Sequence, residues 1–265
     1  MCIRDSSYAV ITNVTALFKA NEDLARTNRE LDRFATVASH DLQEPLRKIA
    51  AFSSLVQRRY ADQLDEDGVR HLDFLVDAAH RMQRLIDDLL AYSRLASQPI
   101  EPRPVDVRRA VNDVLENLDA SITESGARLM IGDLPMVQAD PTLLDQILQN
   151  LISNAIKYRA DAVPEVTIDA HSHEKGWVIS VTDNGIGLDV KFAEKIFAPF
   201  QRLHSREAYK GTGIGLAIVR QAVERHNGQI WVESEEGKGA KFSVLFPGKV
   251  RQATPADTDA DLAAK

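Results

Sequence analysis

The feature that most constrains this chain is a seam of mainly apolar and small residues whose positions are spaced alternately four and three apart. It continues without a break through Leu17, Asn21, Leu24, Asn28, Leu31, Ala35, Ala38, Leu42, Pro45, Ile49, Phe52 and Val56. An average spacing of 3.5 residues is typical of helices that supercoil around one another. Asparagine within such a seam fixes the register and favours a two-stranded parallel pairing. The seam therefore predicts a dimer rather than a lone amphipathic helix.

A second helical seam follows a polar turn at 62–68. Its positions are Leu72, Leu75, Ala79, Met82, Ile86, Leu89 and Ser93. Two antiparallel helices joined by a short loop form a hairpin, and two such hairpins make a dimeric four-helix bundle. Pro99, Pro102 and Pro104 block helix formation, so we expect a stiff linker over residues 99–104.

The pattern after Val105 is typical of mixed α and β structure. Asp140 followed by Pro141 indicates a helix start, because aspartate caps a helix and proline suits its first position. We expect helices over 106–125, from 141 onward and over 213–226, strands over 166–170 and 177–182, and a hairpin that pairs 229–234 with 240–246. A layer of helices on a largely antiparallel sheet is an α+β sandwich. The polar tail 250–265 is predicted to be disordered.

Composition narrows the class of partner. The formal net charge of −7 argues against nucleic acid or an anionic membrane as the primary partner. The single cysteine, Cys2, excludes a disulfide or zinc framework and fits a reducing, cytoplasmic location. No stretch is long and apolar enough to span a membrane, so this segment is expected to make no membrane contact, although a longer parent protein could be anchored upstream.

The first chemical candidate is the pair His40–Asp41, with His40 at the outermost position of the heptad. An imidazole nitrogen is a nucleophile only when it is neutral, which is its main form near neutral pH. An adjacent carboxylate such as Asp41 can accept the proton from one ring nitrogen and leave the other to attack. Pro45 removes a backbone donor inside the helix and should loosen it beside His40, while the unbroken seam predicts that the helix continues.

The second candidate is a nucleotide pocket without a P-loop. Asn150 and Asn154 lie one helical turn apart, and Lys157 and Tyr158 continue that side of the helix. Carboxamide oxygens on a rigid helix can bind Mg²⁺, which prefers oxygen ligands. Asparagine is also a poor helix former, so a purely structural role for both is disfavoured.

Two glycine sets complete the pocket. Asp183 follows a predicted strand, where its carboxylate can accept a hydrogen bond from the amine of adenine. We expect Gly185 and Gly187 to let the backbone approach a flat ring. Gly211, Gly213 and Gly215 precede a helix, whose N-terminal N–H groups can hold phosphates. Each glycine set alone is more often an ordinary turn than part of a nucleotide site.

These motifs resemble those of the sensor histidine kinases, in the subgroup whose phospho-acceptor motif reads His-Asp-Leu-Gln-Glu-Pro-Leu-Arg, here residues 40–47. The resemblance implies that His40 is the phospho-acceptor, Asp41 its general base and Asn154 the magnesium ligand. It also implies that Asp183 selects adenine in a Bergerat-type ATP domain, and that the loop carrying Arg202, together with His204, Arg206 and Lys210, covers ATP.

The same resemblance implies a domain plan. Residues 1–15 are the remnant of an upstream PAS-like sensor or an artefact, 16–98 a signalling helix with the dimerisation and phospho-acceptor domain, 99–104 the linker, 105–249 the ATP domain, and 250–265 the tail. The implied cofactors are ATP and Mg²⁺, and the implied partners are a second copy of the chain and the receiver domain of a response regulator. Glu44 stands where many relatives carry threonine or asparagine, which predicts little phosphatase activity.

Two alternatives stay open: a Bergerat-type ATPase that drives a conformational change, and a catalytically inactive dimer scaffold. The motifs do not specify the input signal, the cognate regulator, or whether phosphorylation occurs within one protomer or across the dimer.

Overall fold

The structure is a computed structural model that describes residues 39, 41–97, 99–160, 162–203, 209 and 211–248. Outside the described residues lie the expected signalling helix, His40, residues 204–208 and 210 of the loop after Leu203, and the C-terminal tail. The chain divides into two compact units, and the boundary between them in the sequence lies between Gln98 and Pro99. No helix in the described part is both long and apolar enough to cross a membrane.

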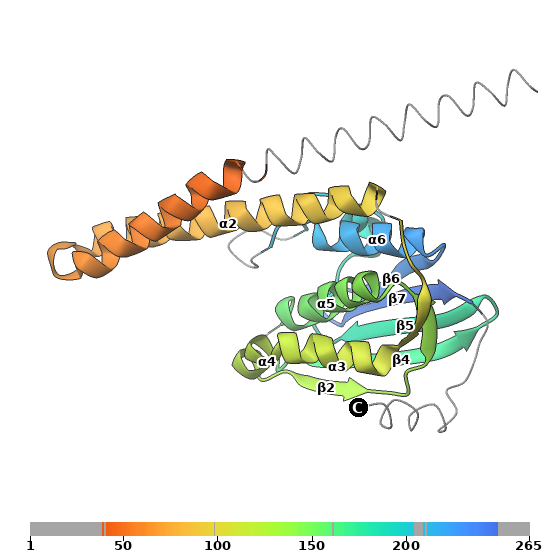
Figure 1. Ribbon diagram of the computed structural model, residues 1–265. Coiled ribbons are helices and arrows are strands. Elements are labelled where there is room, and N and C mark those ends of the chain that lie inside the picture. The colour runs from red at the N-terminus through yellow and green to blue at the C-terminus, as the bar shows by residue number, and fades with distance from the viewer. Residues whose placement is uncertain are drawn as a thin grey trace, which may run out of the picture. The chain divides into compact units, whose positions relative to one another are not determined.

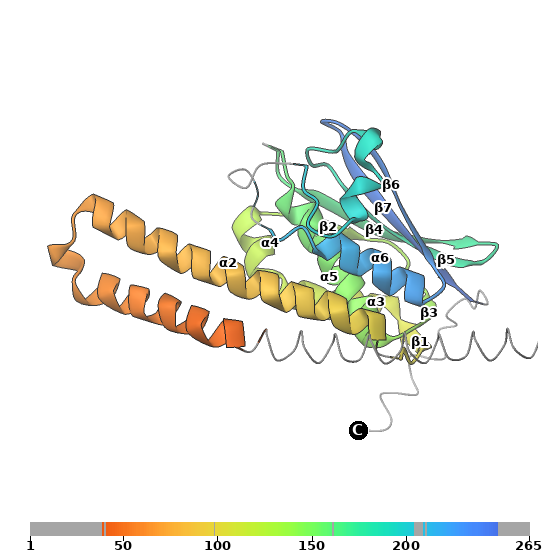
Figure 2. The same cartoon turned by 90° about the horizontal axis from the view of Figure 1, so that it is seen from above.

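The described part of the first unit is a hairpin of two helices (Figure 1, Figure 2). One covers residues 41–59 without interruption at Pro45, as the seam predicted, and a 3₁₀ turn, η1 (Ala61–Gln63), leads to α2 (Glu66–Ser97). The Asp65 carboxylate accepts a hydrogen bond from the Gly68 N–H at 2.7 Å, so it caps the start of α2. Gly68, which we expected in the turn, therefore belongs to the first turn of α2.

Two glutamine–aspartate hydrogen bonds set the register of this hairpin. Gln43 donates to Asp87 at 2.6 Å, and Gln57 donates to Asp73 at 2.8 Å. The step from Gln43 forward to Gln57 is as long as the step from Asp87 back to Asp73, so both pairs fit one antiparallel register. Between them lies a small apolar core of Leu46, Ala50, Ala79 and Ile86. The predicted seam residues Leu42, Ile49, Phe52 and Val56 are instead exposed on this chain.

The main sheet of the second unit has five strands and is covered on one face by helices (Figure 1). The strand order is β2-β4-β5-β7-β6, with β2 and β4 parallel and all other pairs antiparallel. The strands are β2 (Arg128–Ile131), β4 (Glu165–His173), β5 (Gly176–Asp183), β6 (Gln229–Glu235) and β7 (Gly239–Pro247). The helices are α3 (Val107–Asn117), α4 (Asp119–Ser125), α5 (Pro141–Lys157) and α6 (Gly215–Arg225), and 3₁₀ turns η2 (Val190–Phe192) and η3 (Lys195–Phe197) follow β5.

The core lies between this helical layer and the sheet, and α5 occupies its centre. Asp140 caps α5 by accepting hydrogen bonds from the N–H groups of Thr142 and Leu143, and Pro141 takes the first helical position, as predicted. One face of α5 is almost fully buried through Leu144, Ile147, Leu148, Leu151 and Ile152. Burying one such aliphatic side chain contributes about 1.5–3 kcal/mol, so α5 is held firmly in the core.

Two expectations about the start of this unit were inaccurate. The single helix expected over 106–125 is broken at Leu118, where α3 ends and the short α4 begins; α4 then stops at Gly126, whose φ is +67°. The end of the proline-rich linker is also more ordered than expected. Arg103 and Pro104 belong to β1 (Arg103–Asp106), which pairs antiparallel with β3 (Met136–Ala139).

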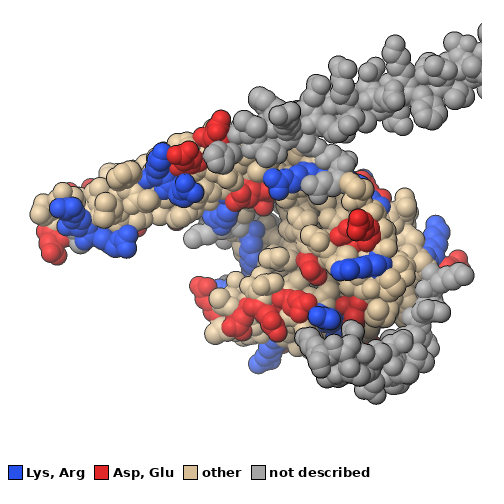
Figure 3. Space-filling view, viewed as in Figure 1, with Lys and Arg blue, Asp and Glu red and all other residues tan. Residues whose placement is uncertain are grey.

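Acidic side chains gather over α3 and α4 (Figure 3). The exposed carboxylates on these helices are Asp113, Glu116, Asp119 and Glu124. Burial raises the pKa of the half-buried Asp145 on α5, and the negative charge of Asp113 raises it further. The ionised form of Asp145 is therefore unfavourable in the folded protein.

Candidate active site

Asp183 stands at the end of β5 with its carboxylate fixed by the backbone. Its Oδ1 accepts hydrogen bonds from the N–H of Gly185 at 2.8 Å and from the N–H of Ala240 at 3.2 Å. Burial raises the pKa of the Asp183 carboxyl, and these two hydrogen bonds offset part of that effect. Within the described part of the chain, no donor meets Oδ2. The site thus holds an oriented acceptor that can take a donor from a ligand.

Gly185 and Gly187 are required by the protein's own backbone. A Cβ on Gly185 would stand 2.2 Å from the carbonyl oxygen of Tyr158, and a Cβ on Gly187, whose φ is +63°, would stand 2.1 Å from that of Glu235. The Ile186 N–H donates to the same Tyr158 carbonyl at 3.0 Å. We expected these glycines to admit a flat ring. The structure gives a different reason for them: they join the loop after β5 to the end of α5 and to the hairpin of β6 and β7.

Asn150 and Asn154 lie on α5 as predicted, and their carboxamides differ in their surroundings. The Asn150 Nδ2 donates to the Gln146 carbonyl at 2.8 Å, and its Oδ1 faces Gly215, where a Cβ would stand only 2.4 Å away. The Asn154 side chain is half-buried and makes no hydrogen bond within the described part of the chain. Both carboxamides therefore offer oxygen atoms to a cation or to water bound to one.

Lys157 and Tyr158 end α5 beside the second glycine set. The Lys157 Nζ lies 3.0 Å from the Tyr158 hydroxyl and 4.2 Å from the centre of its ring. A Cβ on Gly211 would stand 2.5 Å from the same Nζ. Glycine at this position therefore leaves the ammonium group room next to the backbone that leads into α6.

The first turn of α6 lacks a side-chain cap. The side chain of its N-cap residue, Ile214, has no atom that can accept a hydrogen bond, so the opening N–H groups of the helix have no partner within it. Gly213 adopts a φ of +79°, and its carbonyl accepts a hydrogen bond from Phe200 at 2.9 Å. Lys157 and Asn150 border this end of α6. An N-terminus of this kind, with a lysine beside it, attracts phosphate.

Arg202 points its guanidinium group at backbone in this structure. Its Nη1 donates to the carbonyl of Gly211 at 2.6 Å, and its Nη2 donates to the carbonyl of Tyr209 at 2.5 Å. Three other residues expected to cover the nucleotide, His204, Arg206 and Lys210, lie outside the described residues. Tyr209, which the motifs did not indicate, contacts the end of α5 through both its ring and its hydroxyl.

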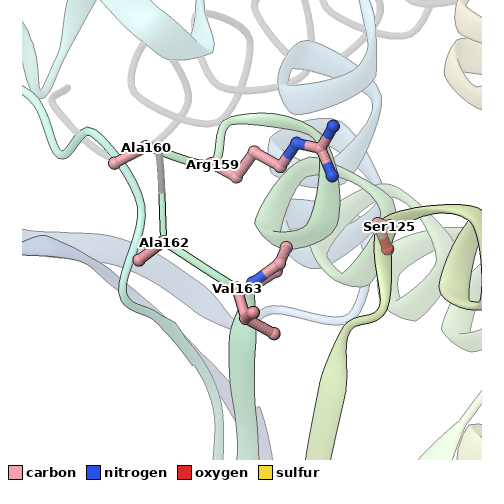
Figure 4. Close-up of a pocket in the computed structure, with 6 residues that line it drawn as sticks. Ser125, Arg159, Ala160, Ala162 and Val163 are labelled. Carbon is pink, nitrogen blue, oxygen red and sulfur yellow. The ribbon is translucent and has the colours of Figure 1, made fainter.

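A hollow of about 340 Å³ lies elsewhere in this unit (Figure 4). It is lined by Ser125, Arg159, Ala160, Ala162, Val163 and Pro164, none of which belongs to the predicted site. Arg159 is the sole charged residue among them. The six described residues that line the hollow bring together no set of groups that could support catalysis.

In the helical unit, the phospho-acceptor motif is described from Asp41 onward, and His40 itself lies outside the described residues. Glu44 pairs with Lys48, whose Nζ lies 2.6 Å from the Glu44 Oε1. This cation lowers the local negative charge that led us to expect weak phosphatase activity, and that expectation stays a prediction. In the described part of the chain, no group of three or more His, Cys, Asp or Glu side chains could hold a metal ion.

Comparison with known families now decides the class. Residues 30–98 match the His Kinase A (phospho-acceptor) domain, and residues 139–250 match the histidine kinase-, DNA gyrase B-, and HSP90-like ATPase family. The two matches together span well over half of the chain. The chain belongs to the histidine kinase family. The first match contains His40 and Asp41, and the second contains both asparagines and both glycine sets.

Known relatives agree with this assignment. The chain is 47% identical to cyanobacterial phytochrome A of Nostoc sp. over 90% of its length and 31% of that protein. It is 44% identical to the phytochrome-like protein Cph1 of Synechocystis sp. over 90% of its length and 32% of that protein. Sensor protein kinase WalK of Staphylococcus aureus is 30% identical over 91% of this chain and 59% of that protein. The chain thus spans about a third of the length of the two phytochromes.

A solved structure extends the similarity to the fold. Full-length ShkA in complex with AMPPNP superposes with a TM-score of 0.64 at 27% identity, over 83% of this chain and 47% of that chain. The family and this similarity support an ATP-binding domain in this histidine kinase, built on α5, α6 and the sheet.

Proposed function

We propose that this histidine kinase transfers the γ-phosphoryl group of ATP to His40 and then passes it to an aspartate of a response regulator. The observation that carries the proposal is the meeting of α5 with the first turn of α6. There the Lys157 ammonium and the Asn150 carboxamide border the glycines before an uncapped helix, in a chain whose other unit matches the phospho-acceptor family.

The nucleotide is held from two ends in this proposal. The Oδ2 of Asp183, which no donor meets within the described residues, accepts a hydrogen bond from the adenine amine. The N–H groups at the start of α6 and the Lys157 ammonium bind the phosphates. A helix N-terminus contributes about 0.3–1 kcal/mol toward an anion, so the lysine and a cation are needed to reach useful affinity.

The cation is Mg²⁺ in this proposal. Mg²⁺ prefers oxygen ligands, keeps several of its waters and shares phosphate oxygens when it binds with ATP. Asn154 supplies a half-buried carboxamide without a hydrogen bond in the described residues, and Asn150 supplies an oxygen whose orientation is fixed by Gln146. When Mg-ATP is bound, ATP would supply the phosphoryl group and Mg²⁺ would neutralise part of the negative charge of the phosphates.

The nucleophile is a ring nitrogen of His40. Asp41, next in the chain, accepts a hydrogen bond from the N–H of the other ring nitrogen of the neutral imidazole, and the attacking nitrogen keeps its lone pair. As the new bond to the γ-phosphorus forms and the bond from that phosphorus to ADP breaks, Asp41 takes the proton, so the phosphorylated ring is left without a positive charge. A positioned general base of this kind contributes about 10²–10⁴-fold in rate. The phosphorylated histidine then donates its phosphoryl group to the receiver domain.

A second copy of the chain completes the helical unit. The buried residues of the first helix are Ser39, Leu46, Ala50 and Ser53, whereas the predicted seam is exposed on a neighbouring stripe of the same helix. In α2, the seam residues Leu75, Met82 and Leu89 are exposed as well. Apolar surface of this extent on two adjacent helices is typical of an interface. We infer a homodimer in which these seams form the centre of a four-helix bundle.

The two alternatives make different products. A conformational ATPase would release inorganic phosphate and leave none on the chain, and an inactive scaffold would do neither. Incubation of the full chain with Mg-ATP labelled at the γ-position, followed by separate counting of free and chain-bound label, distinguishes all three. The proposal predicts bound label that is stable in base and lost in acid, as expected of phosphohistidine.

A further inference from the structure

We propose that Tyr209 is a positioning residue for the phosphate end of the nucleotide, because it fastens the chain entering the second glycine set to the end of α5. This inference rests on the proposed function, and it assigns a role to a residue that the motifs did not indicate.

The side chain of Tyr209 contacts the end of α5 in two ways. Its hydroxyl donates a hydrogen bond to the carbonyl oxygen of Arg159 at 2.8 Å, across fifty residues of sequence. Its ring lies 5.1 Å from the ring of Tyr158, measured between centres, and is tilted by 50°. Aromatic pairs at this distance that avoid a face-to-face sandwich are attractive. One side chain therefore joins two successive residues that follow the buried helix.

The backbone around Tyr209 is held from the other side by Arg202. The two terminal nitrogens of its guanidinium group donate to the carbonyls of Tyr209 and Gly211. Arginine presents several donors in a planar arrangement, so it can donate to two nearby backbone carbonyls at once. Tyr209 and Arg202 together thus place Gly211 in a defined position relative to α5.

The position of Gly211 matters because it borders the Lys157 ammonium. A Cβ at Gly211 would stand only 2.5 Å from the Lys157 Nζ, and the uncapped first turn of α6 begins four residues later. The Tyr209 contact therefore brings together the cation and the helix end that we propose for phosphate binding. The Asp183 carboxylate, which we propose for adenine, is held instead by hydrogen bonds from Gly185 and Ala240. Loss of the Tyr209 contact should consequently weaken phosphate binding and spare adenine binding.

The test uses the full chain and two nucleotides that share adenine but differ in phosphate number, ATP and AMP. Tyr209→Phe removes the hydroxyl and keeps the ring, and Tyr209→Ala removes both contacts. A single hydrogen bond of this kind corresponds to about a two- to tenfold change in affinity. We expect the Kd of Mg-ATP to rise by about that factor in Tyr209→Phe and by more in Tyr209→Ala, while the Kd of AMP stays unchanged.

Two controls make the outcome decisive. Tyr60→Phe removes a tyrosine hydroxyl from the helical unit and should change neither Kd. In a double variant, Tyr209→Phe should have less effect once Lys157→Ala has removed the cation that the contact positions. Unchanged affinity for both nucleotides in Tyr209→Phe would overturn the inference. Equal weakening of both, with a lower Tm, would also overturn it, because the hydroxyl would then serve only the fold. If the wild-type chain failed to bind Mg-ATP, the proposed function itself would be wrong.

Discussion

Replacement of Asp183 by asparagine should change which base the site prefers while leaving the fold intact. The two carboxylate oxygens have separate tasks in the structure. Oδ1 accepts the N–H groups of Gly185 and Ala240, and Oδ2 has no donor within the described residues. An asparagine can keep its carbonyl oxygen on those two N–H groups. Its NH₂ group must then take the place of Oδ2 and turn a donor toward the donor amine of adenine.

The magnitude follows from those contacts. A hydrogen bond to a charged acceptor contributes about 1.5–3 kcal/mol, and a buried donor left facing another donor adds a further penalty. We therefore expect Asp183→Asn to weaken ATP binding by about 2–4 kcal/mol, which is roughly 30- to 1,000-fold in Kd. Inosine triphosphate carries a carbonyl oxygen where ATP carries the amine. Its affinity relative to ATP should rise in the variant, because the new NH₂ group can donate to that oxygen.

Calorimetric titration with ATP and inosine triphosphate checks this prediction, and thermal unfolding supplies its control. Burial raises the pKa of Asp183 above its unfolded value, so the ionised carboxylate reduces the stability of the fold at neutral pH. Removing that charge should leave Tm unchanged or slightly higher. The reasoning is refuted if the variant binds ATP as tightly as the wild type, or if both nucleotides are lost together with a lower Tm.

Three further predictions concern charge and assembly. Asp183 must be ionised to accept the adenine amine, and its pKa is raised above the ordinary 3.8. ATP affinity should therefore be constant well above this raised pKa and should fall as the pH drops through it. Titrations of Asp183→Asn across the same pH range should show no such dependence. Asp145→Asn should raise Tm at neutral pH by about 1–4 °C, because the raised pKa of Asp145 means that its ionised carboxylate is disfavoured in the folded protein. Asp113→Asn should give a smaller rise in Tm. A fall in the Tm of Asp145→Asn would contradict this reasoning. Phe52, 66% exposed on the single chain, should be buried in the dimer, so Phe52→Asp should yield monomers by light scattering with unchanged ATP affinity, and a persistent dimer would exclude this seam as the interface.

The sequence predicted the helices and strands that local rules determine. Asp140 with Pro141 marks the start of α5, and the buried stripe of that helix follows the 3.6-residue period. The strands β4 and β5 are each longer than expected but lie where alternation placed them. The seam through Pro45 correctly predicted an unbroken helix. These features depend on residues close together in the chain.

The features that were missed depend on distant partners. The short β1, β2 and β3 are strands because other strands pair with them, and β2 pairs parallel to β4 across a long connection. The helix breaks at Leu118 without a glycine or proline that would have predicted this break from the sequence. Similarly, Gly187 is explained by the carbonyl of Glu235, and Tyr209 by the carbonyl of Arg159. Contacts of this kind become visible only once the fold brings the segments together.

The central claim is that His40 receives the phosphoryl group, and locating the modified residue tests it most directly. The full chain is incubated with Mg-ATP, digested under neutral to basic conditions that preserve phosphohistidine, and its peptides are sequenced by mass spectrometry. The account predicts phosphate on His40 in the peptide that contains Asp41, and no modification in His40→Gln, although that variant still binds ATP. Phosphate on another residue, or labelling that persists in His40→Gln, would contradict the account.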